Sequence, residues 1–437
     1  MLSQKDLKIS TLSTVKSSNK AYIRFQGGLI MERKACLICE SHVVVEIIDL
    51  GNHPFADTFV PPSQQGEGET LYPLVCMLCE ACGGIQTKYQ TDPLKRYTDI
   101  EYSYTSSNSA FSRAHWDEYA ATIIQKRLLS PGARVIEAGS NDGYLGEQLV
   151  KKGITYVGID PSPHMAQLAT QRGITTITGL FGQETVRQAL ASTDKADLII
   201  ANNVFNHAED PHAFMQAVAQ SLTDTGAFIC EQPYWLTSIE TKKFDQIYHE
   251  HVSYFTVQSL SKLFERVGMY ISSAEVVNYH GGSLRVIAQK KLHNEHDVPE
   301  AKAMIEEEQK KGLFKKETYT LFMQTIRTER NNFLQRVCKL KEEGNTIIAV
   351  GAAAKGNTFL NFYRLDNSFI EYVTDTSPTK KGKYTPATRI PIVGDEIFVG
   401  KSKVCALILS WNLATILKEK LLPLNKDICF ISPEERA

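Results

Sequence analysis

The chain has 437 residues, of which 43% are hydrophobic and 22% charged, a composition typical of a globular protein with about two to four domains. Its 48 basic and 49 acidic residues leave a formal net charge of −1, which gives no electrostatic reason to expect binding to nucleic acid or an anionic membrane. No apolar run reaches the length of about 18 residues that a membrane span needs, and the N-terminus lacks the apolar core of a signal peptide. We therefore expect a cytoplasmic protein whose nine cysteines are metal ligands or core residues.

Residues 1–30 are rich in Ser, Thr and Lys and lack clear periodicity, and Met31 stands directly before the first recognisable element. We expect residues 1–30 to be a flexible extension, or translation to start at Met31. The alternative is a short strand around residues 21–25.

Five cysteines fall in two clusters, CLIC at 36–39 and CMLCEAC at 76–82. Two Cys-x-x-Cys turns brought together make a tetrahedral thiolate site of the structural zinc kind. Gly83 and Gly84 follow the second cluster, and glycine there lets backbone amides turn back toward the sulfurs. Residues 31–95 are therefore predicted to form a small β-rich zinc lobe that leaves Cys76 out. The predicted ligands are Cys36, Cys39, Cys79 and Cys82. The alternative is a pair of packed, reduced cysteine turns without metal.

Short apolar strands alternate with amphipathic helices from residue 130 onward, within a predicted domain of residues 96–293. This alternation predicts an α/β fold, with a parallel sheet covered by helices on both faces. Ligands of such sheets bind at the carboxyl ends of the strands. The predicted strands are 134–139, 156–160, 174–179, 196–203 and 226–233, and the predicted helices are 144–152, 164–172, 184–191 and 212–221.

The run EAGSNDGYLG at 137–146 reads as a glycine turn between an apolar strand and a helix. A glycine turn lets the backbone approach a ligand closely. Asp160, the last residue of the next strand, can accept hydrogen bonds from the two hydroxyls of a ribose. The run has neither the G-x-G-x-x-G spacing of a dinucleotide fold nor the Lys and Ser/Thr of a phosphate loop. Its acidic neighbours suit a ligand with a cationic, amino-acid-bearing centre, and we predict S-adenosylmethionine (SAM). The predicted contacts are Glu137, Gly139, Asn141, Asp142, Gly143, Asp160, Asn202 and Asn203.

The run FDQIYHEHVSYF at 244–255 places a Tyr, two His and a Glu within four residues. Such a group would be costly to bury without partners. If the segment is extended, Tyr248 and Glu250 share one face and His249 and His251 the other, whereas in a turn all four can converge. A metal site at the two histidines and a purely structural role are the alternatives.

Residues 294–343 are charged and lack strand signals, which predicts one or two long helices with a solvated charged face. A second α/β unit follows over 344–437, with a strand, a glycine turn and a helix in TIIAVGAAAKGNTFLNF and with Asp375 after the next strand. The spacing is wrong for a Walker A loop, but helix-start amides with Lys355 nearby could hold a nucleotide diphosphate. Arg285, after a glycine pair, could bind a diphosphate through its fork of donors or pair with a carboxylate on the sheet surface.

Several of these runs occur together in one family. In chain order these are the two cysteine pairs, EAGSNDG with Asp160, ANNVFNH at 201–207, FDQIYHEHVSYF, HGGSLR at 280–285 and GAAAKGNTFLNF at 351–362. From about residue 32 to its end, the chain resembles the SAM-dependent sugar C-methyltransferases. The resemblance implies a zinc lobe, a Rossmann-like SAM domain and a second Rossmann-like domain that helps to bind the substrate. It also implies methylation at C3 of a nucleotide-linked 4-keto-6-deoxy sugar.

The resemblance further implies roles for individual residues. His251 is the expected general base, since a neutral imidazole titrates near physiological pH. Glu250 resembles the residue that bonds a sugar ring hydroxyl. The family's hydrogen-bond donors around the sugar and its enolate are matched here by Tyr248, His207 and Tyr102. Tyr104 is the alternative to Tyr102 for this role.

Other functions stay open at this point. An O- or N-methyltransferase needs only an oriented hydroxyl or amine. An NAD-dependent sugar oxidoreductase conflicts with the glycine spacing, and a zinc module that binds nucleic acid would need a basic face that residues 32–92 lack. We expect a small-molecule nucleotide-diphosphate sugar as partner, no nucleic acid or membrane, and a monomer or weak homodimer. The sequence does not indicate whether the nucleotide is TDP, GDP or CDP.

Overall fold

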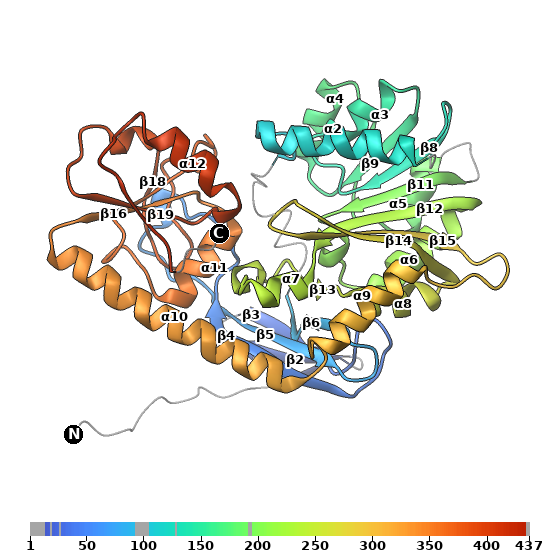
Figure 1. The fold of residues 1–437 in the computed structure, drawn as a ribbon, viewed down its shortest axis with the longest axis horizontal. Coiled ribbons are helices and arrows are strands. Elements are labelled where there is room, and N and C mark those ends of the chain that lie inside the picture. The colour runs from blue at the N-terminus through green and yellow to red at the C-terminus, as the bar shows by residue number, and fades with distance from the viewer. Residues whose placement is uncertain are drawn as a thin grey trace.

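The computed structural model describes residues 14–17, 20–25, 28–91, 105–126, 129–190 and 195–433. Two α/β domains lie side by side, and the N-terminal lobe lies below and between them (Figure 1). A long helical connection runs under the molecule from the central domain to the C-terminal domain (Figure 1). Among the described residues, no helix combines the length and the apolar character that crossing a membrane requires.

The first part of the chain forms strands. β1 (Thr14–Ser17), β2 (Lys20–Phe25), β3 (Gly28–Glu32) and β7 (Tyr89–Gln90) pair into an antiparallel sheet in that order. The prediction of a flexible extension is therefore wrong for these residues, and the strand weighed as the alternative lies within β2. Its register is set by pairing with β3, a partner that local composition does not reveal. Residues 1–13 lie outside the described part of the chain.

The zinc lobe is built on a second antiparallel sheet. β4 (Val44–His53), β5 (Tyr72–Cys79) and β6 (Ile85–Thr87) are consecutive, and β13 (Ser253–Tyr254) completes the order β13-β6-β5-β4. β13 comes from the segment that contains the YHEH run, so the central domain contributes a strand to the lobe's sheet. This exchange was not predicted from the sequence.

The central domain is a seven-stranded sheet in the order β10-β9-β8-β11-β12-β15-β14. All five predicted strands and all four predicted helices are present, with boundaries shifted by a few residues. The first five strands are parallel, but β15 runs antiparallel to both β12 and β14, so the sheet is not wholly parallel as expected. The strands are β8 (Arg134–Ala138), β9 (Thr155–Asp160), β10 (Thr176–Thr178), β11 (Ala196–Asn202), β12 (Leu222–Pro233), β14 (Met269–Val277) and β15 (Ser283–Lys290).

Helices cover the central sheet and carry side-chain caps at several N-termini. Ser162 accepts a bond from the Met165 amide and Asp210 from the Ala213 amide, which satisfies donors that a helix start leaves open. The helices are α2 (Ala110–Gln125), α3 (Tyr144–Val150), α4 (Pro163–Gln171), α5 (Gln183–Leu190), α6 (Pro211–Ser221), α7 (Trp235–Glu240) and α8 (Val257–Glu265). Short 3-10 turns form at η2 (Phe205–His207) and η3 (Phe244–Gln246).

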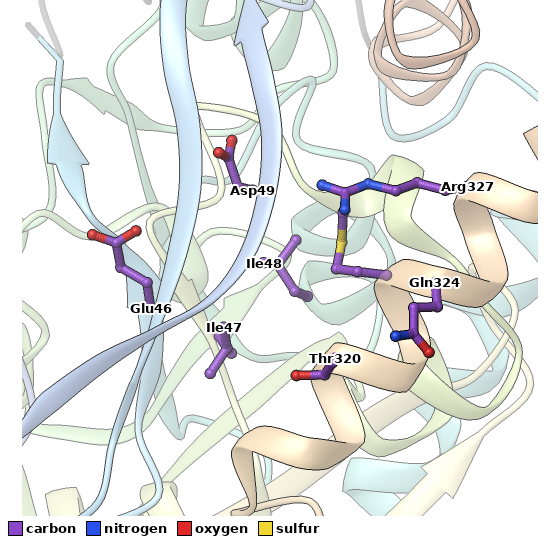
Figure 2. A pocket seen from close by; sticks show the side chains of 8 residues that line it. Glu46, Ile47, Ile48, Asp49, Thr320, Gln324 and Arg327 are labelled. Carbon is purple, nitrogen blue, oxygen red and sulfur yellow. The ribbon is translucent and has the colours of Figure 1, made fainter.

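The predicted helical connection consists of α9 (Pro299–Lys310) and α10 (Lys316–Glu342). α10 lies against β4 of the zinc lobe, and the two elements line a small open pocket (Figure 2). From β4 the pocket takes Glu46, Ile47, Ile48 and Asp49, and from α10 it takes Thr320, Met323, Gln324 and Arg327.

The C-terminal domain is a five-stranded parallel sheet in the order β18-β17-β16-β19-β20. The predicted strand, glycine turn and helix are β16 (Thr346–Val350) and α11 (Ala354–Tyr363). The remaining elements of this domain are β17 (Tyr372–Thr374), β18 (Ile392–Val393), β19 (Val404–Ile408), β20 (Cys429–Ile431), α12 (Ala414–Leu421), and the 3-10 turns η4 (Asp395–Phe398) and η5 (Trp411–Leu413). A further 3-10 turn, η1 (Pro62–Gln64), lies between β4 and β5 of the zinc lobe.

Candidate active site and zinc centre

The four predicted zinc ligands come together. One Sγ atom from each of Cys36, Cys39, Cys79 and Cys82 lies within 4.8 Å of the others. The Cys36 and Cys82 sulfurs are 3.5 Å apart, and those of Cys39 and Cys79 are 3.6 Å apart. Thiolates about 2.3 Å from a tetrahedral zinc ion are separated by a similar distance. Within the described chain this is the one group of three or more such side chains close enough to hold a metal, so a metal site at the two YHEH histidines finds no support.

The backbone around the sulfurs also fits a metal-thiolate centre. The Ile38 amide points at the Cys36 sulfur, 3.4 Å away, and a Cβ on Gly84 would lie 3.3 Å from two of the sulfurs. The predicted need for glycine beside the ligands is therefore met. Cys76 is fully buried in β5 and lies outside the cluster, as predicted.

The predicted SAM residues gather at the carboxyl ends of β8, β9 and β11. The Asp160 carboxylate accepts the Asn141 amide at 2.9 Å and the Ser162 amide at 2.9 Å, which fixes it at the end of β9. Gly139 and Gly143 have φ values of 64° and 74°, in the left-handed region that glycine adopts without strain. A Cβ on Gly143 would lie 2.9 Å from the Ala169 side chain, so the turn also needs glycine for packing.

Two observations show that this edge fits an adenosyl ligand. The Nδ2 atom of buried Asn202 has no hydrogen-bond partner among the described residues, while its Oδ1 accepts from Tyr119. An orphaned donor at the end of β11 and a fixed carboxylate at the end of β9, on the same edge of the sheet, suit a ligand that carries both hydroxyls and acceptors. Asn203, with φ 52°, turns the chain away after β11, and its amide donates to the Glu231 carbonyl.

The other acidic residues of this turn are held by the protein itself. Glu137 accepts a hydrogen bond from the Tyr156 hydroxyl, and burial raises the pKa of Glu137 to about 8. Asp142 accepts from Ser106 at 2.5 Å and pairs with Arg172 at 3.2 Å. Their predicted contact with SAM stays a prediction.

The YHEH run, residues 248–251, is a turn. The His251 amide donates to the Tyr248 carbonyl at 2.9 Å, which brings the two side chains together. The Tyr248 hydroxyl and His251 Nε2 are 2.6 Å apart. His249 points elsewhere, because its ring lies 5.6 Å from that of Phe55 in the zinc lobe. Glu250 is buried in the same turn.

The hydrogen bonds of His251 define its tautomer. Nδ1 lies 2.7 Å from the Gln246 carbonyl oxygen, which only accepts, so Nδ1 carries the proton. In the neutral ring Nε2 then carries a lone pair, which accepts a hydrogen bond from the Tyr248 hydroxyl. Burial, with repulsion from His207 and Lys355, holds the pKa of His251 well below its ordinary value. His251 is therefore an oriented neutral base at physiological pH.

His251 lies next to the carboxyl ends of β8, β9 and β11, where SAM is predicted to bind; this edge of the sheet is called the SAM edge below. Its ring centroid is 4.9 Å from that of His207, which follows the end of β11 in η2. The next residue is tied to the same element, since the Val252 amide donates to the Asn206 carbonyl at 2.9 Å. Tyr102 and Tyr104, the other predicted donors, lie outside the described residues.

Arg285 is part of an ion pair. Its guanidinium meets the buried Glu231 carboxylate at 2.8 Å across β15 and β12, and it stacks on the Tyr119 ring. His115 of α2 binds the other Glu231 oxygen at 2.8 Å. Of the two roles predicted for Arg285, the structure shows pairing with a carboxylate of the sheet, and the diphosphate contact stays a prediction. Sequence reasoning missed His115 and Glu231, whose pairing spans distant parts of the chain.

Lys355 of α11 faces the central domain beside η5. Its ammonium lies 5.1 Å above the Trp411 ring, and neither an ion pair nor a hydrogen bond of this ammonium occurs among the described residues. Burial lowers the pKa of Lys355 to about 8, an effect that Asp245 opposes and Lys243 increases. The group therefore stays largely cationic at neutral pH, with donors available to an anion.

Comparison with known proteins covers most of the chain. Family models match in succession a zinc binding domain over residues 36–97, a methyltransferase domain over 112–274 and a C-methyltransferase C-terminal domain over 278–432. C-methyltransferase NovU of Streptomyces niveus is 29% identical over 379 residues, which cover 87% of this chain and 90% of that protein. The chain is a SAM-dependent methyltransferase, and over most of its length it is similar to a C-methyltransferase. Its cofactors are SAM and a structural zinc ion, which sets the NAD-dependent oxidoreductase aside.

Other relatives match a smaller part of the chain. The ubiquinone biosynthesis O-methyltransferase of Hahella chejuensis is 24% identical over 130 residues, 29% of this chain and 55% of that protein. Among solved structures, the magnesium protoporphyrin IX methyltransferase ChlM of Synechocystis PCC 6803 with bound SAH has a TM-score of 0.34 at 19% identity. It covers 41% of this chain and 83% of that chain.

Proposed function

We propose that this C-methyltransferase removes the C3 proton of a nucleotide-diphosphate 4-keto-6-deoxy sugar and methylates the resulting enolate. The observation that carries the proposal is the His251 imidazole, which is neutral, held in one tautomer, and placed beside the SAM edge. Transfer to an oxygen or a nitrogen does not require such a base, whereas a carbon acid next to a ketone does.

Tyr248 is positioned to serve the same step. Without substrate its hydroxyl donates to His251 Nε2. A substrate ketone that enters the turn offers this hydroxyl a new acceptor, so the Nε2 lone pair becomes free for the C3 proton. The phenol then donates to the C4 oxygen as negative charge develops there, which stabilises the enolate.

The neighbouring residues complete the proposed contacts. His207 and Tyr102 are proposed to donate to the sugar, and Glu250 to accept from a ring hydroxyl. Lys355 is proposed to meet the diphosphate, since its ammonium has donors available at the domain junction. Bound SAM supplies the electrophilic methyl group, so that a C–C bond forms at C3 as the S–CH₃ bond breaks and the proton from C3 resides on Nε2. Solvent later removes that proton from His251.

The test uses purified protein with SAM and a nucleotide-linked 4-keto-6-deoxy sugar in deuterated water. We expect methyl transfer to carbon and, without SAM, exchange of the C3 hydrogen for deuterium. Because the pKa of His251 lies below its ordinary value, the exchange rate should stay constant from pH 8 to about 6.5 and fall only at lower pH. His251→Gln should abolish both reactions. Methyl transfer without any C3 exchange would instead favour an oxygen or nitrogen acceptor.

A further inference from the structure

Trp411 joins the C-terminal domain to the segment that precedes the YHEH turn. It belongs to η5, and its indole Nε1 donates to the Asp245 carboxylate at 2.6 Å. Asp245 lies in η3 and is fully buried. A short charge-assisted bond of this kind is among the stronger hydrogen bonds in proteins. The contact spans 166 residues of sequence and fixes η3 from the side of the other domain.

The same indole is enclosed by further groups of the central domain. The Lys243 ammonium lies 4.8 Å from the ring centroid and donates to the Gly281 carbonyl. Gly281 has φ 78°, and a Cβ there would overlap the indole. The residue at 281 must therefore be glycine both for its backbone conformation and for the close approach of Trp411.

Aromatic packing holds η3 from a second direction. The Phe244 ring lies 4.7 Å from that of Phe362 and 6.0 Å from that of Tyr363, both on α11. Phe244 is fully buried between the two domains. η3 is thus seated on the C-terminal domain at consecutive residues, by the Phe244 ring and by the Asp245 carboxylate.

The next residue of η3 sets the tautomer of the base. The Gln246 carbonyl accepts the His251 Nδ1 proton at 2.7 Å. The Gln246 side chain is itself fixed, because its Oε1 accepts the Ser238 hydroxyl at 3.2 Å. If this carbonyl moved away, the imidazole would lose its contact with a group that can only accept, and the Tyr248 hydroxyl, which can donate to or accept from Nε2, would not fix the tautomer.

We infer that Trp411 and Asp245 are positioning residues, through which the C-terminal domain holds the Gln246 carbonyl against His251 and keeps the Nε2 lone pair turned toward the substrate. The inference rests on the proposed function for its kinetic consequences. Neither residue touches the reacting atoms. Their effect passes through one backbone carbonyl, so it falls on the orientation of the base and leaves SAM binding unchanged.

The test is Trp411→Phe, which removes the indole N–H and keeps an aromatic ring between the two lysines. Misplacement of a catalytic group by about 1 Å costs about 100-fold in rate, and we expect kcat for C3 deuterium exchange to fall by about 10- to 100-fold. The affinity for SAM, measured by titration, should match that of the wild-type protein. Asp245→Asn keeps an oxygen that accepts the indole N–H, so it should retain most of the kcat.

Trp235→Phe is the matched control. The Trp235 indole is also buried and donates to the Tyr319 hydroxyl of α10 at 3.0 Å, so its loss weakens a comparable contact. We expect this variant to lower the melting temperature with an exchange kcat near that of the wild type. A Trp411→Phe protein that unfolds easily is thereby distinguished from one whose base is misplaced.

A second readout needs no substrate. Nitrogen NMR of histidine-labelled protein, assigned with His251→Gln, should show pure Nδ1–H imidazole in the wild type and a tautomer mixture in Trp411→Phe. Wild-type exchange kinetics together with an unchanged tautomer in Trp411→Phe would overturn the inference. If the wild-type protein itself exchanges no C3 hydrogen, the proposed function fails, and the NMR spectra alone decide the positioning role.

Discussion

Loss of one zinc ligand is the sharpest perturbation that the structure offers. The chain provides a matched pair of buried cysteines in β5, of which Cys79 belongs to the thiolate cluster and Cys76 does not. Cys79→Ala should release the metal, and Cys76→Ala should retain it. Both substitutions remove one sulfur from the same strand, so the comparison isolates the metal from the general cost of a small cavity.

The size of the effect follows from the ligand count. Zinc binding contributes about 10–16 kcal/mol to the folding of zinc-finger peptides, and an even division among four thiolates gives about 2.5–4 kcal/mol for one. Cys76→Ala should cost about 1 kcal/mol, as for one buried methylene. A domain is stable by only about 5–15 kcal/mol. If the weakened site releases its metal, the whole zinc contribution is lost, which is sufficient to unfold the lobe.

The consequence for the reaction comes from β13. The Thr87 amide of the lobe donates to the Val252 carbonyl at 2.8 Å, next to the YHEH turn, and β6 pairs with β13. A lobe without zinc should release this anchor. We therefore expect Cys79→Ala to lose methyl transfer and to retain SAM binding, since the SAM edge is formed by the central sheet.

The assay combines zinc content by elemental analysis, SAM affinity by fluorescence titration and methyl transfer from labelled SAM. The wild type and Cys76→Ala should hold about one equivalent of zinc per chain, and Cys79→Ala much less. A zinc-free Cys79→Ala protein with full activity would refute the argument that the lobe supports the turn. A fully metallated Cys79→Ala protein would refute the ligand assignment.

Three further predictions concern single side chains. Asp160→Asn should lower SAM affinity in a fluorescence titration by about 10- to 100-fold, because a charged hydrogen-bond acceptor contributes about 1.5–3 kcal/mol. Asp197→Asn is the control: the Asp197 carboxylate accepts the Arg134 backbone amide at the other end of the sheet, so SAM affinity should not change. Gly143→Ala should lower the melting temperature and weaken SAM binding, because the new Cβ meets Ala169 at 2.9 Å in a left-handed turn. Burial raises the pKa of Glu308 from 4.5 to about 6, so its carboxyl binds protons more tightly when folded, and the stability it contributes falls as pH rises through this window. The free energy of unfolding from denaturant titrations should therefore favour the wild type over Glu308→Gln more at pH 4.5 than at pH 7, by about 1.6 kcal/mol; an equal difference at both pH values would contradict the assigned pKa.

Features set by local pattern were predictable from the sequence. β8, β9 and β10 are short apolar runs that end beside glycine or at an acid, and α4 and α6 each begin with a capping residue followed by proline. The zinc ligands follow from the spacing and the glycines after the second pair. The convergence of Tyr248 and His251 was one of two possibilities weighed, and the hydrogen-bonded turn decides it.

Features set by distant partners were not predictable. The strands before residue 33 pair with each other and with β7, and the antiparallel β15 depends on its place between β12 and β14. His115 and Glu231 are 116 residues apart, and each alone resembles an ordinary surface residue in the sequence. Trp411 lies outside every motif recognised in the sequence. Its contact with Asp245 forms where two domains meet, 166 residues apart in the sequence.

The YHEH turn has no regular structure of its own, and this explains why three domains surround it. The residues before it are seated on the C-terminal domain through Phe244. The residues after it pair with the zinc lobe through β13, and its middle lies against η2 of the central sheet. The lobe also binds the C-terminal domain directly, since the Asn357 side chain donates to the Ala56 carbonyl at 2.6 Å. Proton transfer to a base depends on the orientation of that base, and holding an irregular turn at both ends fixes this orientation. A single small domain would offer no second surface from which to hold the turn.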